Sequence, residues 1–133
     1  MSSATKSMII QASIEIVWAA LTDADSISGW MGGPAKSDLR PGGKYAYFED
    51  ATTGRYTLVE QPHRLEYTWR QSEWPVEWSD STVKWELKPE GKGTSVHLVH
   101  DNFPNESERA SHDEGWDLYW LEPMKEWLEK DAR

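Results

Sequence analysis

Cysteine is absent from the 133-residue sequence, which excludes disulfide bonds and thiol chemistry. Positive charge is also scarce, since 14 Lys and Arg stand against 23 Asp and Glu and the formal net charge is −9. This balance argues against nucleic acid as a partner, because phosphate binding needs clustered cations. It also argues against binding to an anionic membrane surface.

Long apolar runs are missing as well. No stretch approaches the 18 apolar residues of a membrane-spanning helix, and the N-terminal MSSATKSMIIQAS has no apolar segment of signal-peptide length. A cytoplasmic protein is therefore expected. No repeat, low-complexity tract or long internal linker divides the chain, so residues 1–133 are expected to form a single domain.

Tryptophan, in contrast, is abundant. Nine Trp residues accompany only two Phe in a chain whose mean hydropathy is −0.76. Such large aromatic faces in a polar chain fit two arrangements, a core filled with indole rings or an aromatic pocket. Both remain open at the level of composition.

The hydrophobic period changes twice along the chain. Residues 6–11 predict a first strand, residues 14–21 a helix with Ser13 as its N-cap, and residues 23–31 a second short helix. From about 36 to 102 apolar and polar residues alternate, which predicts antiparallel strands with one buried face. The residues expected to face inward include Tyr45, Tyr47, Tyr56, Leu58, Leu65, Tyr67, Trp69, Val83, Trp85, Leu87, Val96, Leu98 and His100.

A helical period returns in the last segment, residues 106–131. Asn105 and Ser111 are both candidate N-caps, and Ser111 with Glu114 fits a capping box. One narrow stripe of this helix holds Trp116, Trp120, Pro123 and Trp127, with His112 in line and Tyr119 and Met124 on its flanks.

Pro123 interrupts this helical pattern. Proline has no N–H, so the carbonyl of Tyr119 loses its helical partner and a bend is expected there. The freed carbonyl would serve a ligand or an ordered water. The alternative is that Pro123 begins a separate helix.

The order of elements predicts an α+β fold. A strand, two short helices, a run of antiparallel strands and one long amphipathic helix follow each other. One helix covers a sheet of six or seven strands only if the sheet curls around it. A curved antiparallel sheet wrapped around the C-terminal helix is therefore expected, with a space between the two.

Several segments, in this order and spacing, resemble the START-like, helix-grip (SRPBCC) superfamily. They are ASIEIVWAALTDADSISGWM, LRPGGKY, EQPHRLEYTW, STVKWEL, GKGTSVHLVH and the GW at 115–116. Within the superfamily the chain is similar to the branch named for the activator of heat-shock-protein-90 ATPase. The resemblance implies the helix-grip fold and its cavity, and it implies no single activity.

Two departures from the family bear on function. The segment QSEWPVEWSD at 71–80 places two extra Trp and a Pro between core strands. Chaperone-activating relatives carry a further N-terminal domain that this sequence does not contain, so a chaperone partner is not indicated.

The side chains expected to face the cavity are the candidate ligand-binding residues. His100 and His112 are also the interior candidates for acid–base chemistry, or else structural histidines. His97 and His100 stand three apart on a strand and face opposite sides, so no metal site is expected. The full candidate set is Tyr45, Tyr47, Tyr56, Tyr67, Trp69, Trp85, His100, His112, Trp116, Tyr119 and Trp120.

The loop at residues 72–78 supplies two further candidates. Trp74 and Trp78 flank Pro75 and are expected either at the cavity rim, as a gate, or folded back over the end of the core. Packing against a second copy of the chain is a third arrangement.

The leading hypothesis is a binding protein for a small hydrophobic or aromatic molecule, in a stress-response or detoxification setting. A second hypothesis is an enzyme of the cyclase or hydrolase kind that uses a pocket His or Tyr, and a third is a chaperone-regulating interaction protein. No catalytic residue and no cofactor is assigned, and the chain is expected to be a monomer or homodimer.

Overall fold

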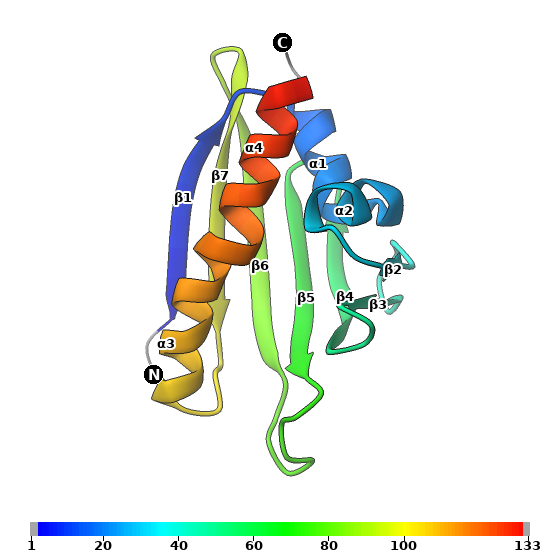
Figure 1. Ribbon diagram of the computed structural model, residues 1–133, viewed down its shortest axis with the longest axis vertical. Coiled ribbons are helices and arrows are strands. Elements are labelled where there is room, and N and C mark those ends of the chain that lie inside the picture. The colour runs from blue at the N-terminus through cyan, green and yellow to red at the C-terminus, as the bar shows by residue number, and fades with distance from the viewer. Residues whose placement is uncertain (1–2, 132–133) are drawn as a thin grey trace.

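The sheet organises the molecule (Figure 1). The computed structural model describes residues 3–131. Seven antiparallel strands lie in the order β1-β7-β6-β5-β4-β3-β2, which confirms the predicted α+β fold and puts the first strand at an edge. The strands are β1 (Ala4–Ile10), β2 (Ala35–Ser37), β3 (Lys44–Tyr47), β4 (Thr52–Glu60), β5 (Arg64–Gln71), β6 (Ser81–Glu90) and β7 (Gly93–Asp101).

The C-terminal helix crosses one face of the sheet, with the two short helices beside its end (Figure 1). The helices are α1 (Ile14–Thr22), α2 (Ala24–Met31), α3 (Glu106–Gly115), the π-helical η1 (Trp116–Leu121) and α4 (Glu122–Asp131). Ser13 caps α1 as predicted, and Asn105 caps α3 by accepting a hydrogen bond from the N–H of Glu108 at 2.9 Å. The capping box at Ser111 was a wrong prediction, because Ser111 lies inside α3.

The predicted inward faces of β5, β6 and β7 are buried. The prediction for β4 holds only as far as Tyr56, which lies opposite Tyr67. A bulge then shifts the register, so Leu58 lies opposite the outward Glu66, and Val59 packs against the core instead. One extra residue in a strand reverses which side chains face inward beyond it. For that reason the prediction that Leu58 faces inward and Val59 outward was wrong.

Pro123 widens the helix instead of breaking it. Glu122 donates its N–H to the carbonyl of Asp117, five residues back, which is the π-helical pattern. In a regular α-helix the proline ring would clash with the carbonyl of the residue four positions before it. The wide turns of η1 directly before α4 avoid that clash. Pro123 is the second residue of α4 in an unbroken helical run, so it neither ends the helix nor begins a separate one.

The wide turns also rotate the buried face of the helix. Trp116 and Trp120 are buried as predicted, but Pro123 and Trp127 are only half-buried. From the end of η1 onward the buried side chains are Leu121, Met124 and Leu128. A stripe drawn at a constant 100° per residue misses this shift, because π-helical turns contain more residues.

Two helical glycines, Gly115 and Gly29, should respond differently to replacement by alanine. A Cβ at Gly115 would meet no atom closer than 3.7 Å, whereas a Cβ at Gly29 would lie 2.9 Å from Cζ2 of Trp127. Alanine is favoured over glycine inside a helix by about 1 kcal/mol. We expect Gly115→Ala to raise the free energy of unfolding by up to about 1 kcal/mol, and Gly29→Ala to lose that gain by displacing the indole. Urea unfolding of both variants checks this, and a stabilising Gly29→Ala would contradict the packing of α2 on α4.

Candidate functional site

A cavity of about 320 Å³ lies between the C-terminal helix and the ends of β4 and β5. Its size falls at the lower end of the range of small-molecule sites. No Asp, Glu, Lys or Arg belongs to its wall. The lining residues are Phe48, Ala51, Thr52, Trp69, Gln71, Ser111, His112, Gly115, Trp116, Tyr119 and Trp120.

Three of the aromatic lining residues come from η1. Trp116 and Trp120 pack their rings 4.9 Å apart, and Trp69 of β5 lies 5.0 Å from the ring of Trp116. Tyr119, on the same π-helical segment, is 64% exposed beside the cavity. π-Helical segments occur often at functional sites. Trp116, Tyr119 and Trp120 all reach the cavity wall from this one segment.

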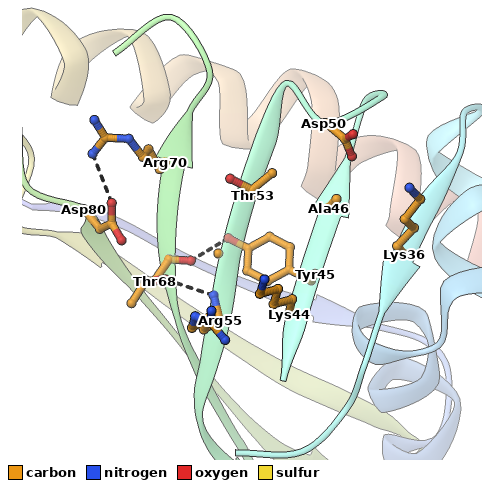
Figure 2. A pocket seen from close by; sticks show the side chains of 11 residues that line it. Lys36, Lys44, Tyr45, Ala46, Asp50, Thr53, Arg55, Thr68, Arg70 and Asp80 are labelled. Carbon is orange, nitrogen blue, oxygen red and sulfur yellow. Dashed lines mark hydrogen bonds and ion pairs between the residues drawn. The ribbon is translucent and has the colours of Figure 1, made fainter. Parts of the chain in front are cut away.

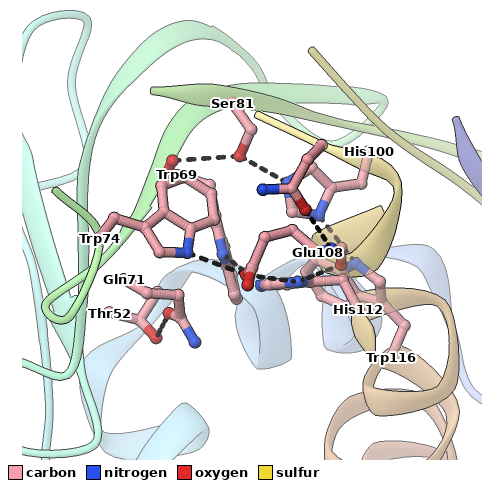
Figure 3. A network of polar contacts seen from close by, with 10 residues as sticks. Thr52, Trp69, Gln71, Trp74, Ser81, His100, Glu108, His112 and Trp116 are labelled. Carbon is pink, nitrogen blue, oxygen red and sulfur yellow. Dashed lines mark hydrogen bonds and ion pairs between the residues drawn. The ribbon is translucent and has the colours of Figure 1, made fainter. Parts of the chain in front are cut away.

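One polar pair is set in the opposite wall. The hydroxyl of Thr52 donates a hydrogen bond to Oε1 of Gln71 (Figure 3). The amide nitrogen of Gln71 makes no hydrogen bond within residues 3–131, so its N–H donors remain for a ligand acceptor. A few placed polar groups in an apolar wall are typical of ligand sites.

The mouth of the cavity includes a strained turn. Phe48, Glu49 and Asp50, between β3 and β4, have φ angles of 55°, 55° and 69°. Left-handed backbone is uncommon for non-glycine residues and especially for bulky ones. Phe48 is 39% exposed and lines the cavity with its neighbour Ala51. Strain of this kind concentrates at binding and active sites.

The ring nitrogens of both interior histidines are held in hydrogen bonds within the protein (Figure 3). His112 donates from Nδ1 to the carbonyl of Glu108 at 2.8 Å and accepts at Nε2 from the indole N–H of Trp69 at 3.1 Å. His100 accepts at Nδ1 from the indole N–H of Trp116 at 3.0 Å and bonds through Nε2 to Ser81 at 2.7 Å. The hydroxyl of Ser81 in turn donates to the carbonyl of Trp69. All four ring nitrogens are therefore occupied.

His100 is fully buried, and burial together with the neighbouring His112 lowers the pKa of its imidazole to about 2. The neutral ring acts as a fixed donor and acceptor that aligns Trp116 with the sheet. This arrangement favours a structural role for both histidines over proton transfer.

Four tyrosines form a second aromatic cluster in the core behind the cavity. Burial raises the pKa of each of their phenols, so none is ionised near neutral pH. Tyr45 donates to the carbonyl of Thr68, Tyr56 bonds to Ser37, and Tyr67 accepts from the indole of Trp85. The hydroxyl of the fourth, Tyr47, is buried and has no partner among the described residues.

The structure separates the candidate site residues into two groups. Trp69, His112, Trp116, Tyr119 and Trp120 line the cavity. The other six are not part of its wall and pack in the aromatic core: Tyr45, Tyr47, Tyr56, Tyr67, Trp85 and His100.

The two Trp residues of the loop fold back over the end of the core. Trp74 is 5% exposed, donates to the carboxylate of Glu108 at 2.9 Å and lies 6.0 Å from the ring of Trp78. Neither lines the cavity. Arg70 holds the loop by donating to the carbonyls of Pro75 and Trp78. Within residues 3–131 the two rings thus lie as in the capping arrangement.

Sequence reasoning missed six lining residues. Gln71 had a usable signal, since it continues the inward series of Leu65, Tyr67 and Trp69 by two positions. The others were not recognised as lining residues, because the positions of a turn and of the helix over the sheet follow from tertiary packing. They are Phe48, Ala51, Thr52, Ser111 and Gly115.

The fold agrees with the comparison to known proteins. The family described as activator of Hsp90 ATPase homolog 1-like protein matches residues 11–129, and the chain belongs to this family. No helix within residues 3–131 is long and apolar enough to cross a membrane.

Two solved structures are similar over most of the chain. An HSP90 activator from Plasmodium falciparum has 26% identity and a TM-score of 0.87, with 96% of each chain covered. CalU16 from Micromonospora echinospora has 29% identity and a TM-score of 0.82, with 95% of this chain and 73% of that chain covered. An uncharacterized protein of Schizosaccharomyces pombe is 28% identical over 60 residues, which is 45% of this chain and only 18% of that protein.

Proposed function

We propose that this protein binds a small neutral aromatic molecule in the cavity between the C-terminal helix and the sheet. The observation that carries the proposal is the composition of the wall, which combines four aromatic rings of Trp and Tyr with no charged side chain. Burying an ion there would be costly without a charged partner. The volume of about 320 Å³ suits one or two fused rings.

Gln71 supplies the orienting group in this proposal. Its amide N–H donors are open to a carbonyl or hydroxyl oxygen of the ligand, since Thr52 occupies the amide oxygen. The exposed rings of Phe48 and Tyr119 would cover the ligand at the mouth. A cytoplasmic stress-response or detoxification role is part of the same proposal, and the match to the activator of Hsp90 ATPase family supports its stress-response part.

Binding without turnover is the form that the site chemistry favours. The nitrogens of His100 and His112 are engaged within the protein, and the buried tyrosines remain protonated. A cyclase or hydrolase reaction that used one of these groups would need it released.

Regulation of an Hsp90-type chaperone is the second candidate. It is favoured by the 96% mutual coverage with the Plasmodium protein described as an HSP90 activator. Stimulation of the ATPase rate of such a chaperone by the purified chain tests it independently of the cavity.

Coumarin, a neutral bicyclic compound with one carbonyl, is the probe for the ligand site. We expect it to quench Trp fluorescence saturably, and its anionic analogue coumarin-3-carboxylate to bind at least about tenfold more weakly because no cation lines the wall. Tyr119→Ala is expected to lower coumarin affinity about tenfold by removing one ring contact.

The matched control is Leu118→Ala. Leu118 is the exposed neighbour of Tyr119 on η1 and does not line the cavity. The Leu118→Ala variant should bind coumarin with an affinity within about twofold of the wild type. Equal losses in both variants, or quenching that never saturates, would refute the proposed site.

A further inference from the structure

A second hollow, of about 550 Å³, lies on the sheet face that points away from the C-terminal helix (Figure 2). Its floor is made of small outward-facing residues of β3, β4 and β5. Long side chains stand around them. The lining residues are Lys36, Lys44, Tyr45, Ala46, Asp50, Thr53, Gly54, Arg55, Thr68, Arg70 and Asp80.

Strand register explains why the hollow exists. Lys36 of β2 lies opposite Ala46, Ala46 opposite Thr53, and Thr53 opposite Arg70 of β5. A row across four strands therefore has a cation at each end and small side chains between them. Three strand spacings separate the two ends, which is about 14 Å. Figure 2 shows Lys36 and Arg70 on opposite sides of the hollow.

A second row brings two like charges together. Lys44 lies directly opposite Arg55, and both side chains are exposed on the outer face. Like charges in this position destabilise a sheet. Lys36, Lys44 and Arg55 take part in no ion pair among residues 3–131. An anion placed between them would relieve their mutual repulsion.

Acidic residues offset only part of this charge. Asp80 pairs with Arg70 at 3.1 Å, and Asp50 stands on the turn before β4. Four cations against two carboxylates leave the hollow with a net charge of +2, in a chain whose net charge is −9. Arg70 is also tied to the carbonyls of Pro75 and Trp78, so its guanidinium is fixed in place.

We propose that this hollow docks an extended acidic segment of a partner protein. Carboxylates at positions i and i+4 of an extended peptide lie about 13 Å apart, which matches the span from Lys36 to Arg70. A carboxylate between them would face Lys44 and Arg55. The hydroxyls of Thr53 and Thr68 on the floor are within the same hollow and suit the peptide backbone. The surface is independent of the ligand cavity, with which it shares no lining residue.

The test uses a fluorescein-labelled five-residue peptide with Glu at both ends and Ser or Thr between, and a matched peptide with Gln at both ends. Fluorescence anisotropy should show the Glu peptide binding about tenfold more tightly than the Gln peptide, with affinity falling as salt rises. The double variant Lys36→Glu with Lys44→Glu should weaken the Glu peptide about tenfold or more.

The matched control carries the same charge change elsewhere. Lys88→Glu with Lys92→Glu alters two exposed lysines around the β6–β7 turn, and it should leave peptide affinity within about twofold. Equal weakening in both double variants would overturn the proposal, because only net charge would then matter. Sedimentation showing a dimer that the Lys36–Lys44 variant dissociates, without peptide binding, would assign the hollow to a second copy of the chain and overturn it too.

Discussion

Trp116→Ala is expected to lower the free energy of unfolding by about 3–5 kcal/mol, the usual cost of truncating a buried aromatic residue. The Trp116 ring is 2% exposed and lies between those of Trp69, Trp85 and Trp120 at 5.0, 5.7 and 4.9 Å. The substitution also leaves Nδ1 of buried His100 without its donor, which adds a desolvation penalty. Urea unfolding followed by circular dichroism measures the loss.

Trp127→Ala is the matched control on the same helix. Its ring is only half-buried and forms no hydrogen bond within the described residues. We expect a loss of about 1–2 kcal/mol. Equal losses at the two positions would contradict the view that the helix grips the sheet through η1.

Acidification is expected to destabilise the protein between pH 6.5 and 5 through His100. Burial keeps the pKa of its imidazole near 2 in the folded chain, whereas an unfolded histidine titrates near 6.5. The unfolded state therefore binds the additional proton in this range. The contribution of His100 is complete above about pH 6.5 and falls by up to about 1.4 kcal/mol for each pH unit below it.

Two glutamine variants separate this effect from the other titrating groups. His100→Gln should be less stable at pH 7. Between pH 6.5 and 5, however, the slope of its unfolding free energy against pH should correspond to about one proton fewer taken up on unfolding than in the wild type. His97→Gln, on the exposed side of the same strand, should keep the wild-type dependence. An unchanged slope in His100→Gln would show that His100 is not held neutral by burial.

Period and order were enough to predict the fold. Alternation over 64–71 and 81–102 predicted the buried faces correctly, because each strand has one covered side and a side-chain period of two. The two failures in predicting which side chains face inward are local departures from that period. The bulge after Tyr56 and the π-helical turns before Pro123 each change the number of residues per repeat.

The site was less predictable than the fold. Trp69 and Tyr67 both point inward from β5. Trp69 lines the cavity, whereas Tyr67, two residues earlier, packs in the core. Which of them meets open space depends on where η1 crosses the sheet, and that follows from long-range packing. Phe48 carried no periodic signal, since its exposure comes from three left-handed residues in a turn.

Intermolecular NMR contacts between coumarin and the labelled protein locate the ligand directly. We expect nuclear Overhauser effects from the coumarin ring protons to Trp116, Tyr119 and Phe48, and from the protons beside its carbonyl to Gln71. We expect none to Lys44 or Thr53 on the outer face. Contacts confined to that outer face, or an absence of contacts at saturating coumarin, would contradict a ligand site between the C-terminal helix and the sheet.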